Sequence, residues 1–181
     1  MTWHELRRHV PNALTIARFA AIPIFAWLYL RAGDGAAWGA GIFFAGAAVT
    51  DQVDGFLARR WHVESRFGTV ADPLADRLMI GTAVVLMWAT GRIPLLVAAI
   101  VVARDLTLVL GYTVLSPRGL ELDVTFLGKL ATWVLYAALC FCLVTAEGTT
   151  WPLVLVWIGI ALAVAAAAQY VIRARGVLGR S

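Results

Sequence analysis

The chain has 181 residues, of which 61% are hydrophobic and only 14% are charged, and its mean hydropathy is +0.81. Soluble domains carry about 25% charged residues, so this composition excludes an ordinary soluble enzyme and indicates an integral membrane protein. The formal net charge is +4, which in such a protein is more typical of cytoplasmic flanks and contact with anionic lipid than of nucleic-acid binding. We expect no nucleic-acid partner.

The N-terminal segment, residues 1–11, places apolar and basic side chains on different helical faces. This pattern is typical of a short amphipathic helix that lies on the membrane surface. Pro11 and Asn12 follow it and are expected to turn the chain into the membrane. At the other end, residues 173–181 form a basic tail.

Between these ends, six apolar segments follow one another, separated by short polar or glycine-containing stretches. Each is about 20 residues long, the length that a helix needs to cross a bilayer. They are residues 12–31, 37–58, 69–90, 93–115, 125–146 and 151–172. The sequence therefore predicts a single all-α, polytopic membrane domain over residues 1–181, with six transmembrane helices preceded by the interfacial helix.

Basic residues outside the spans predict the orientation, because they gather on the cytoplasmic side of a membrane. With six spans, only Arg31 and Arg92 fall on one side. The other side carries Arg7, Arg8, Arg59, Arg60, Arg66, Arg118, Arg173, Arg175 and Arg180. We therefore expect both termini to be cytoplasmic.

Four aspartates stand within 26 residues of this apolar chain, near the inner ends of the second and third predicted spans. Asp51 and Asp54 are spaced i, i+3, so they project from one helical face. Asp72 and Asp76 are spaced i, i+4 and do the same. Four carboxylates that share a pocket repel one another unless cations lie among them. Oxygen-only ligation favours Mg²⁺ or Mn²⁺ over zinc.

Small residues and one arginine accompany the aspartates. Gly55 and Ala58 lie one and two turns from Asp51 and leave room for a bulky group near the backbone. Gly68, where the loop enters the third span, has the same property. Arg59 adds a guanidinium, whose fork geometry suits phosphate oxygens. The pattern indicates a site for a metal-bound phosphate compound.

These residues also have other interpretations, some of them purely structural. A single aspartate inside a membrane often forms a hydrogen bond between helices or carries a proton. Arg59 could anchor the cytoplasmic surface, and Gly55 and Ala58 could serve helix packing. A protein of another class, an ion or proton-coupled transporter, could use the same carboxylates, and a non-catalytic scaffold is a third possibility. The two helical pairs, taken with the glycines and the arginine, favour the metal site.

The complete pattern resembles the signature of the CDP-alcohol phosphatidyltransferase family, with no position missing. It consists of Asp51, Asp54, Gly55, Ala58, Arg59, Gly68, Asp72 and Asp76 at the spacings printed in the sequence. The stretches "VPNALTIARFAAIP" and "GKLAT" (residues 128–132) extend the likeness over most of the chain.

The resemblance implies that a membrane enzyme moves the phosphatidyl group of CDP-diacylglycerol to an alcohol and releases CMP. It implies two Mg²⁺ or Mn²⁺ ions held by Asp51, Asp54, Asp72 and Asp76. Asp76 is also implied as the general base for the acceptor hydroxyl. The nucleotide of the donor would be accommodated by Gly55, Ala58, Gly68 and Arg59.

Three basic residues within the apolar segments are candidates for binding an acceptor phosphate: Arg18, Arg104 and Lys129. The alternative is that they pair with Asp105 or with an aspartate of the cluster. Arg118, in the loop "SPRGLELD", is a weaker candidate.

Two acceptors suit such a basic pocket: phosphatidylglycerol, which gives cardiolipin, and glycerol 3-phosphate, which gives phosphatidylglycerophosphate. The stretch "ARDLTLVLGY" is similar to cardiolipin synthases of the eukaryotic type, which also occur in actinobacteria, and favours phosphatidylglycerol. Phosphatidylglycerophosphate synthases usually have Arg-Glu where Arg104 and Asp105 stand. The resemblance also implies a homodimer, and we expect it in a bacterial cell membrane. The orientation predicted from the basic residues places the active site on the cytoplasmic side. Small-residue surfaces for such an interface are offered by Gly41 with Ala45 and by Gly159 with Ala163.

Overall fold

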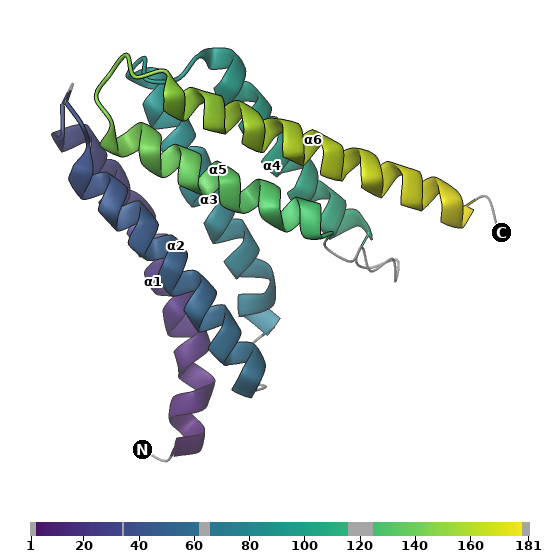
Figure 1. Ribbon diagram of the computed structural model, residues 1–181. Coiled ribbons are helices and arrows are strands. Elements are labelled where there is room, and N and C mark those ends of the chain that lie inside the picture. The colour runs from purple at the N-terminus through teal and green to yellow at the C-terminus, as the bar shows by residue number, and fades with distance from the viewer. Residues whose placement is uncertain (1–2, 34, 62–65, 116–124, 179–181) are drawn as a thin grey trace.

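The described part of the chain is almost entirely helical, and no strand occurs in it (Figure 1). The computed structural model describes the backbone of residues 3–33, 35–61, 66–115 and 125–178, and the side chains of residues 16–33, 35–50, 74–110 and 125–169. Its six helices are α1 (Trp3–Arg31), α2 (Trp38–Trp61), α3 (Arg66–Ala89), α4 (Leu95–Leu115), α5 (Phe126–Val144) and α6 (Trp151–Leu178). The prediction of an all-α fold with six helical segments is confirmed.

The N-terminal interfacial helix is not confirmed as a separate element. Helix α1 is continuous from Trp3 to Arg31 and passes through Pro11 and Asn12, where we expected a turn. Proline removes one backbone hydrogen bond from a helix interior and often kinks the helix, but here the helix continues on both sides of Pro11. Residues 3–11 thus extend the first predicted span.

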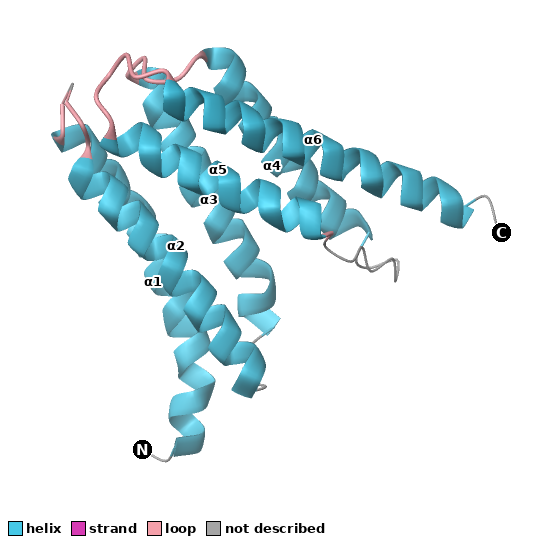
Figure 2. Ribbon diagram, viewed as in Figure 1, coloured by secondary structure: helices cyan, strands magenta, loops and turns pink. Residues whose placement is uncertain are grey.

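Three helical hairpins share one end of the molecule. The loops that join α1 to α2, α3 to α4 and α5 to α6 gather there, and the helices diverge from that end (Figures 1 and 2). Among the helix pairs in contact are α5 with α6, α1 with α3, α1 with α2, and α2 with α5. Both chain ends lie away from the gathered loops, which we call the loop end.

The core near the loop end is built from apolar side chains of α1, α2, α3 and α5. The rings of Phe25 and Phe44 lie 5.5 Å apart between their centroids, and those of Phe44 and Tyr136 lie 5.4 Å apart. Met87 and Leu139 are also fully buried. These contacts join helices that are distant in sequence, so the hairpins form one packed unit.

Large apolar side chains are also exposed on all six helices, far more than a water-soluble surface tolerates in one contiguous area. Two helical segments in the described part of the chain, Phe126–Val144 and Trp151–Gln169, are long and apolar enough to cross a membrane. Apolar surface of this kind suits hydrocarbon rather than water. Representative exposed residues, one from each helix in order, are Ile24, Ile42, Val85, Leu96, Phe126 and Val164.

The two glycines proposed for a dimer interface pack inside the bundle instead. A Cβ on Gly41 would contact Val144 and lie 3.5 Å from Cβ of Leu143, both at the end of α5. A Cβ on Gly159 would lie 3.3 Å from the backbone of Leu135. Glycine at these positions lets α2 and α6 approach α5 closely, so these two small-residue surfaces are already used within the chain.

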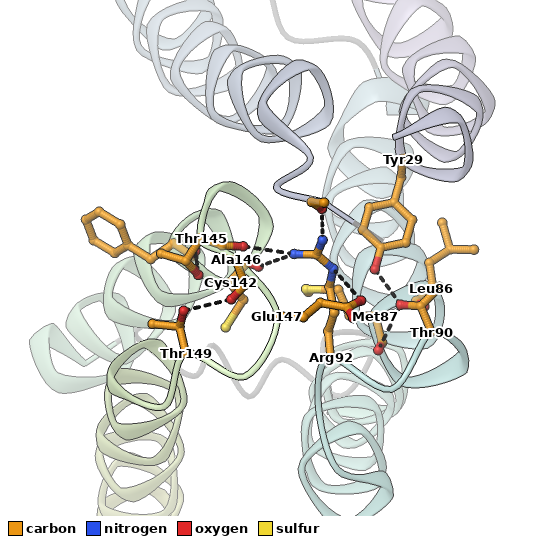
Figure 3. Close-up of polar contacts among 12 residues, drawn as sticks. Tyr29, Leu86, Met87, Thr90, Arg92, Cys142, Thr145, Ala146, Glu147 and Thr149 are labelled. Atoms are coloured by element: carbon orange, nitrogen blue, oxygen red, sulfur yellow. Dashed lines mark hydrogen bonds and ion pairs between the residues drawn. The ribbon is translucent and has the colours of Figure 1, made fainter. Parts of the chain in front are cut away.

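A single guanidinium, that of Arg92, links the three hairpins at the loop end (Figure 3). Its Nη1 donates to the carbonyl oxygens of Cys142 and Thr145, each at 3.1 Å, and its Nη2 donates to the carbonyl of Gly35. Its Nε lies 3.7 Å from Oε1 of Glu147, and its side chain is only 4% exposed. We call Arg92 with these three carbonyl groups the Arg92 clasp.

The clasp stabilises the end of α5. The last carbonyl groups of a helix have no partner within the helix, and a cation near them also interacts favourably with the helix dipole. A second contact supports the same end, because the backbone N–H of Ala37 donates to the carbonyl of Leu143 at 2.7 Å. Tyr29 and Thr90 share a hydrogen bond of 2.6 Å beside it.

We predict that Arg92→Met lowers the stability of the folded protein by about 2–4 kcal/mol, because it removes an almost fully buried cation and leaves two partly buried carbonyl groups without this donor. Thermal unfolding in detergent measures the change. Arg31→Met is the matched control, since Arg31 is exposed and, among the described side chains, its guanidinium lies over the ring of Trp27, 4.2 Å from the centroid. An equal loss of stability in both variants would contradict the role given to the clasp.

Candidate active site

The signature residues lie on two helices, away from the loop end. Asp51 and Asp54 are within α2, and Asp72 and Asp76 are within α3, so the backbone at all four positions is helical, as the spacing argument assumed. Of the remaining signature residues, α2 carries Gly55, Ala58 and Arg59, and α3 carries Gly68. Among all eight, only the side chain of Asp76 is described. The meeting of the two aspartate pairs is therefore still a prediction.

Asp76 faces Arg18 of α1. The Nε of Arg18 lies 3.7 Å from Oδ1 of Asp76, and the two side chains are 12% and 33% exposed. This is the pairing with an aspartate of the cluster that we gave as the alternative for Arg18. A third of the Asp76 side chain stays accessible, so the pair holds Asp76 in place without covering it.

A second acid, Asp105 of α4, lies between two arginines. Its Oδ1 accepts from Nη1 of Arg104 at 2.8 Å and from Nη1 of Arg77, on α3, at 3.4 Å. The Asp105 side chain is 8% exposed, and its Oδ2 accepts no hydrogen bond from the described residues. Arg104 therefore also makes the pairing that we gave as its alternative.

Arg104 is held from a second direction by α5. Its Nη2 donates to Oγ1 of Thr132 at 2.9 Å, and the hydroxyl of Thr132 donates to the carbonyl of Gly128 at 3.0 Å. Because the one hydroxyl hydrogen is used by Gly128, a lone pair of Thr132 faces the guanidinium. Lys129 lies one turn earlier on α5 and is exposed.

These residues form a polar belt that crosses α1, α3, α4 and α5. Its members are Arg18, Asp76, Arg77, Arg104, Asp105 and Thr132. At 1.5 Å per helical residue, Asp76 lies about 20 Å and Asp105 about 15 Å from the ends of their helices at the loop end. With three arginines and two aspartates, the belt carries one excess positive charge.

The four signature aspartates are chemically suited to divalent metal ions. They supply only carboxylate oxygens, the ligands that Mg²⁺ and Mn²⁺ prefer. Within the described side chains no group of three or more histidine, cysteine or acidic residues gathers, and three of the four aspartates stand outside that set. The one described carboxylate, that of Asp76, is partly exposed and can accept a ligand.

Comparison with known proteins agrees with the signature. The model of the family described as CDP-alcohol phosphatidyltransferase matches residues 8–165, which include every residue of the polar belt. The chain belongs to the CDP-alcohol phosphatidyltransferase family. It is therefore an enzyme, a transferase, and the transporter interpretation is not favoured.

Relatives in the family carry two different names. The chain is 38% identical over 147 residues to a cardiolipin synthase (CMP-forming) of Streptomyces coelicolor, covering 78% of this chain and 67% of that protein. It is 31% identical over 170 residues to a CDP-diacylglycerol–glycerol-3-phosphate 3-phosphatidyltransferase of Escherichia coli K12, covering 80% and 91%. The enzyme of that same name from Bacillus subtilis is 32% identical over 137 residues, covering 69% and 71%.

Two members of the belt were not singled out by the sequence reasoning. Arg77 directly follows Asp76, and a charged residue inside an apolar segment is itself a signal of function. Thr132 ends the "GKLAT" stretch, but nothing in the sequence indicates that its hydroxyl meets Arg104. Arg118, the loop candidate, lies outside the described residues.

Proposed function

We propose that the chain transfers the phosphatidyl group of CDP-diacylglycerol to phosphatidylglycerol, forming cardiolipin and releasing CMP. The observation that carries the choice of acceptor is the Arg104–Asp105 pair, whose sequence context is similar to cardiolipin synthases and whose charges meet at 2.8 Å in the belt. The 38% identity to a protein named cardiolipin synthase supports the same choice. Glycerol 3-phosphate is the alternative acceptor, supported by the relatives at 31% and 32% identity.

In the proposed reaction the acceptor's hydroxyl oxygen attacks the phosphorus that carries the diacylglycerol. A bond forms between that oxygen and phosphorus, the bond from phosphorus to the CMP oxygen breaks, and the hydroxyl proton passes to a base. Asp76 is the proposed base, because its side chain is partly exposed and the ion pair with Arg18, at 3.7 Å, holds its carboxylate in place. Arg104, and Lys129 one turn from Thr132, are proposed to bind the acceptor phosphate.

A divalent metal centre is proposed at Asp51, Asp54, Asp72 and Asp76. Two Mg²⁺ or Mn²⁺ ions held there would neutralise charge on the diphosphate of the donor. Room for the nucleotide next to the backbone is proposed at Gly55, Ala58 and Gly68. Arg59, on the same helix as Asp51, is proposed to contact the donor phosphates.

The proposed placement is a bacterial cell membrane crossed six times, with both termini and the active site on the cytoplasmic side. Exposed apolar side chains on every helix support burial in lipid. A donor and an acceptor that keep their acyl chains in the bilayer need a site open sideways to lipid. A homodimer is also proposed from the family, on a surface other than Gly41 and Gly159, which pack internally.

The acceptor is tested by supplying radiolabelled CDP-diacylglycerol and a divalent metal ion with either phosphatidylglycerol or glycerol 3-phosphate. We expect CMP release and labelled cardiolipin with phosphatidylglycerol, at a rate at least about tenfold above that with glycerol 3-phosphate, which corresponds to about 1.4 kcal/mol of discrimination. Faster turnover with glycerol 3-phosphate would replace the proposed acceptor with the alternative.

Chelation is predicted to abolish turnover, because the four carboxylates repel one another without bound cations. Activity is measured as CMP release in excess EDTA and again after Mg²⁺ or Mn²⁺ is restored in excess over the chelator. Recovery with either ion is expected. Turnover that persists in EDTA would rule out the proposed metal centre.

Asp76→Asn is predicted to lower kcat by at least about 100-fold, because an amide cannot take the hydroxyl proton. Donor binding, measured by retention of radiolabelled CDP-diacylglycerol, is expected to persist. The control is Glu147→Gln, which alters an exposed carboxylate at the loop end and should leave kcat within about twofold. Near-normal turnover of Asp76→Asn would exclude Asp76 as the base.

A further inference from the structure

The arrangement around Asp105 places two like charges unusually close together. One oxygen of Asp105 accepts from Arg104 at 2.8 Å and from Arg77 at 3.4 Å. The two guanidinium nitrogens are therefore within about 6 Å of each other, a separation at which like charges repel unless a counter-charge is held beside them. Asp105 supplies that counter-charge from α4 to arginines on α3 and α4.

The side chain of Asp105 is less exposed than those of the two arginines that it pairs with. Its side chain is 8% exposed, whereas those of Arg77 and Arg104 are 29% and 17% exposed. The two arginine side chains are thus more accessible to an approaching anion than the carboxylate that pairs with them. Among these three side chains, one carboxylate balances two guanidinium groups, which leaves one positive charge for such an anion.

The orientation of Arg104 is fixed independently. Thr132 accepts from Nη2 of Arg104 while donating to the carbonyl of Gly128, so the guanidinium is held between α4 and α5 at both terminal nitrogens. A planar guanidinium fixed in this way is preorganised, because less side-chain entropy is lost when a ligand binds. Arg77, held by Asp105 alone among the described contacts, depends more strongly on the carboxylate.

We propose that Arg77 and Arg104 together bind the phosphate group of the acceptor, and that Asp105 is the positioning residue that holds them side by side. This inference rests on the proposed function, because both candidate acceptors carry a phosphate. Phosphate oxygens accept charge-assisted bonds at about 2.7–2.9 Å, so one phosphate can reach two nitrogens that lie within about 6 Å of each other. Arg77 directly follows Asp76 on α3, so the proposed phosphate site and the proposed base start from the same level of that helix.

The test measures KM for the acceptor at saturating CDP-diacylglycerol, KM for the donor at saturating acceptor, and kcat. Loss of a hydrogen bond to a charged group predicts that Arg77→Gln and Asp105→Asn each raise the acceptor KM about tenfold or more. The donor KM should stay within about twofold, because these residues do not contact the donor in this proposal. Asp105→Glu, which restores the carboxylate, should recover most of the loss.

The Asp105→Asn variant distinguishes a role of Asp105 in positioning the two arginines from a role in offsetting their charge alone. If Asp105 only offset positive charge, its removal would leave two unbalanced guanidinium groups and lower the acceptor KM. An unchanged or lowered acceptor KM, or a donor KM that rises equally, would overturn the inference. Arg31→Gln is the matched control for loss of an exposed arginine at the loop end, and it should change neither KM.

The Arg77→Lys variant distinguishes a binding defect from a folding defect. It keeps the positive charge and loses only the fork geometry of the guanidinium. This variant should raise the acceptor KM severalfold with a thermal unfolding midpoint close to that of the unaltered protein. An acceptor KM equal to that of the unaltered protein would overturn the role of Arg77 even if Asp105→Asn failed to fold.

The outcomes also distinguish this inference from the function on which it rests. If the unaltered protein released no CMP with either acceptor, the proposed function would fail. If it turned over and the variants showed no selective rise in acceptor KM, only the inference would fail. A selective rise seen with glycerol 3-phosphate rather than phosphatidylglycerol would support the phosphate site and correct the acceptor.

Discussion

The cost of placing charge inside an apolar helix bundle governs the arrangement of this molecule. An unpaired charged side chain in hydrocarbon costs at least about 2.5–3.5 kcal/mol, and the chain carries several within its helices. Arg18 meets Asp76, while Arg77 and Arg104 meet Asp105. These pairings join α1 to α3 and α3 to α4, so the same contacts that neutralise charge also fix where the helices lie. The same ion pairs therefore also hold in place the arginines that are proposed to bind substrate.

Among the described side chains, polar interactions between helices lie at two levels of the bundle, and the two levels differ in kind. At the loop end, Arg92 is paired mostly with backbone carbonyl groups, and its side chain is almost wholly covered. In the polar belt, the arginines pair with carboxylates and remain partly accessible, and one positive charge is left over. A covered and satisfied cation stabilises a fold, whereas an accessible excess cation can bind anions. The residues that join the hairpins are therefore different from those proposed to bind a phosphate.

The sequence predicted the helices well because apolar runs of membrane length ended at turn residues that are easy to recognise. The second predicted span, 37–58, corresponds to α2 at Trp38–Trp61, and the fifth, 125–146, to α5 at Phe126–Val144. The expected turn at Pro11 was not observed, since a proline weakens a helix without necessarily ending it. The partners of Arg92 could not be predicted, because backbone carbonyl groups have no sequence signal. The candidate acceptor-site arginines were found by their charge, but their sharing of Asp105 required tertiary structure.

The Arg92 clasp also constrains how the molecule is assembled during synthesis. Arg92 follows α3, but the carbonyl groups of Cys142 and Thr145 belong to a hairpin that leaves the ribosome later. Until α5 arrives, a nascent chain has a cation near the membrane boundary that lacks these two acceptors. The last hairpin then supplies these acceptors, and the guanidinium of Arg92 contacts all three hairpins only in the complete chain.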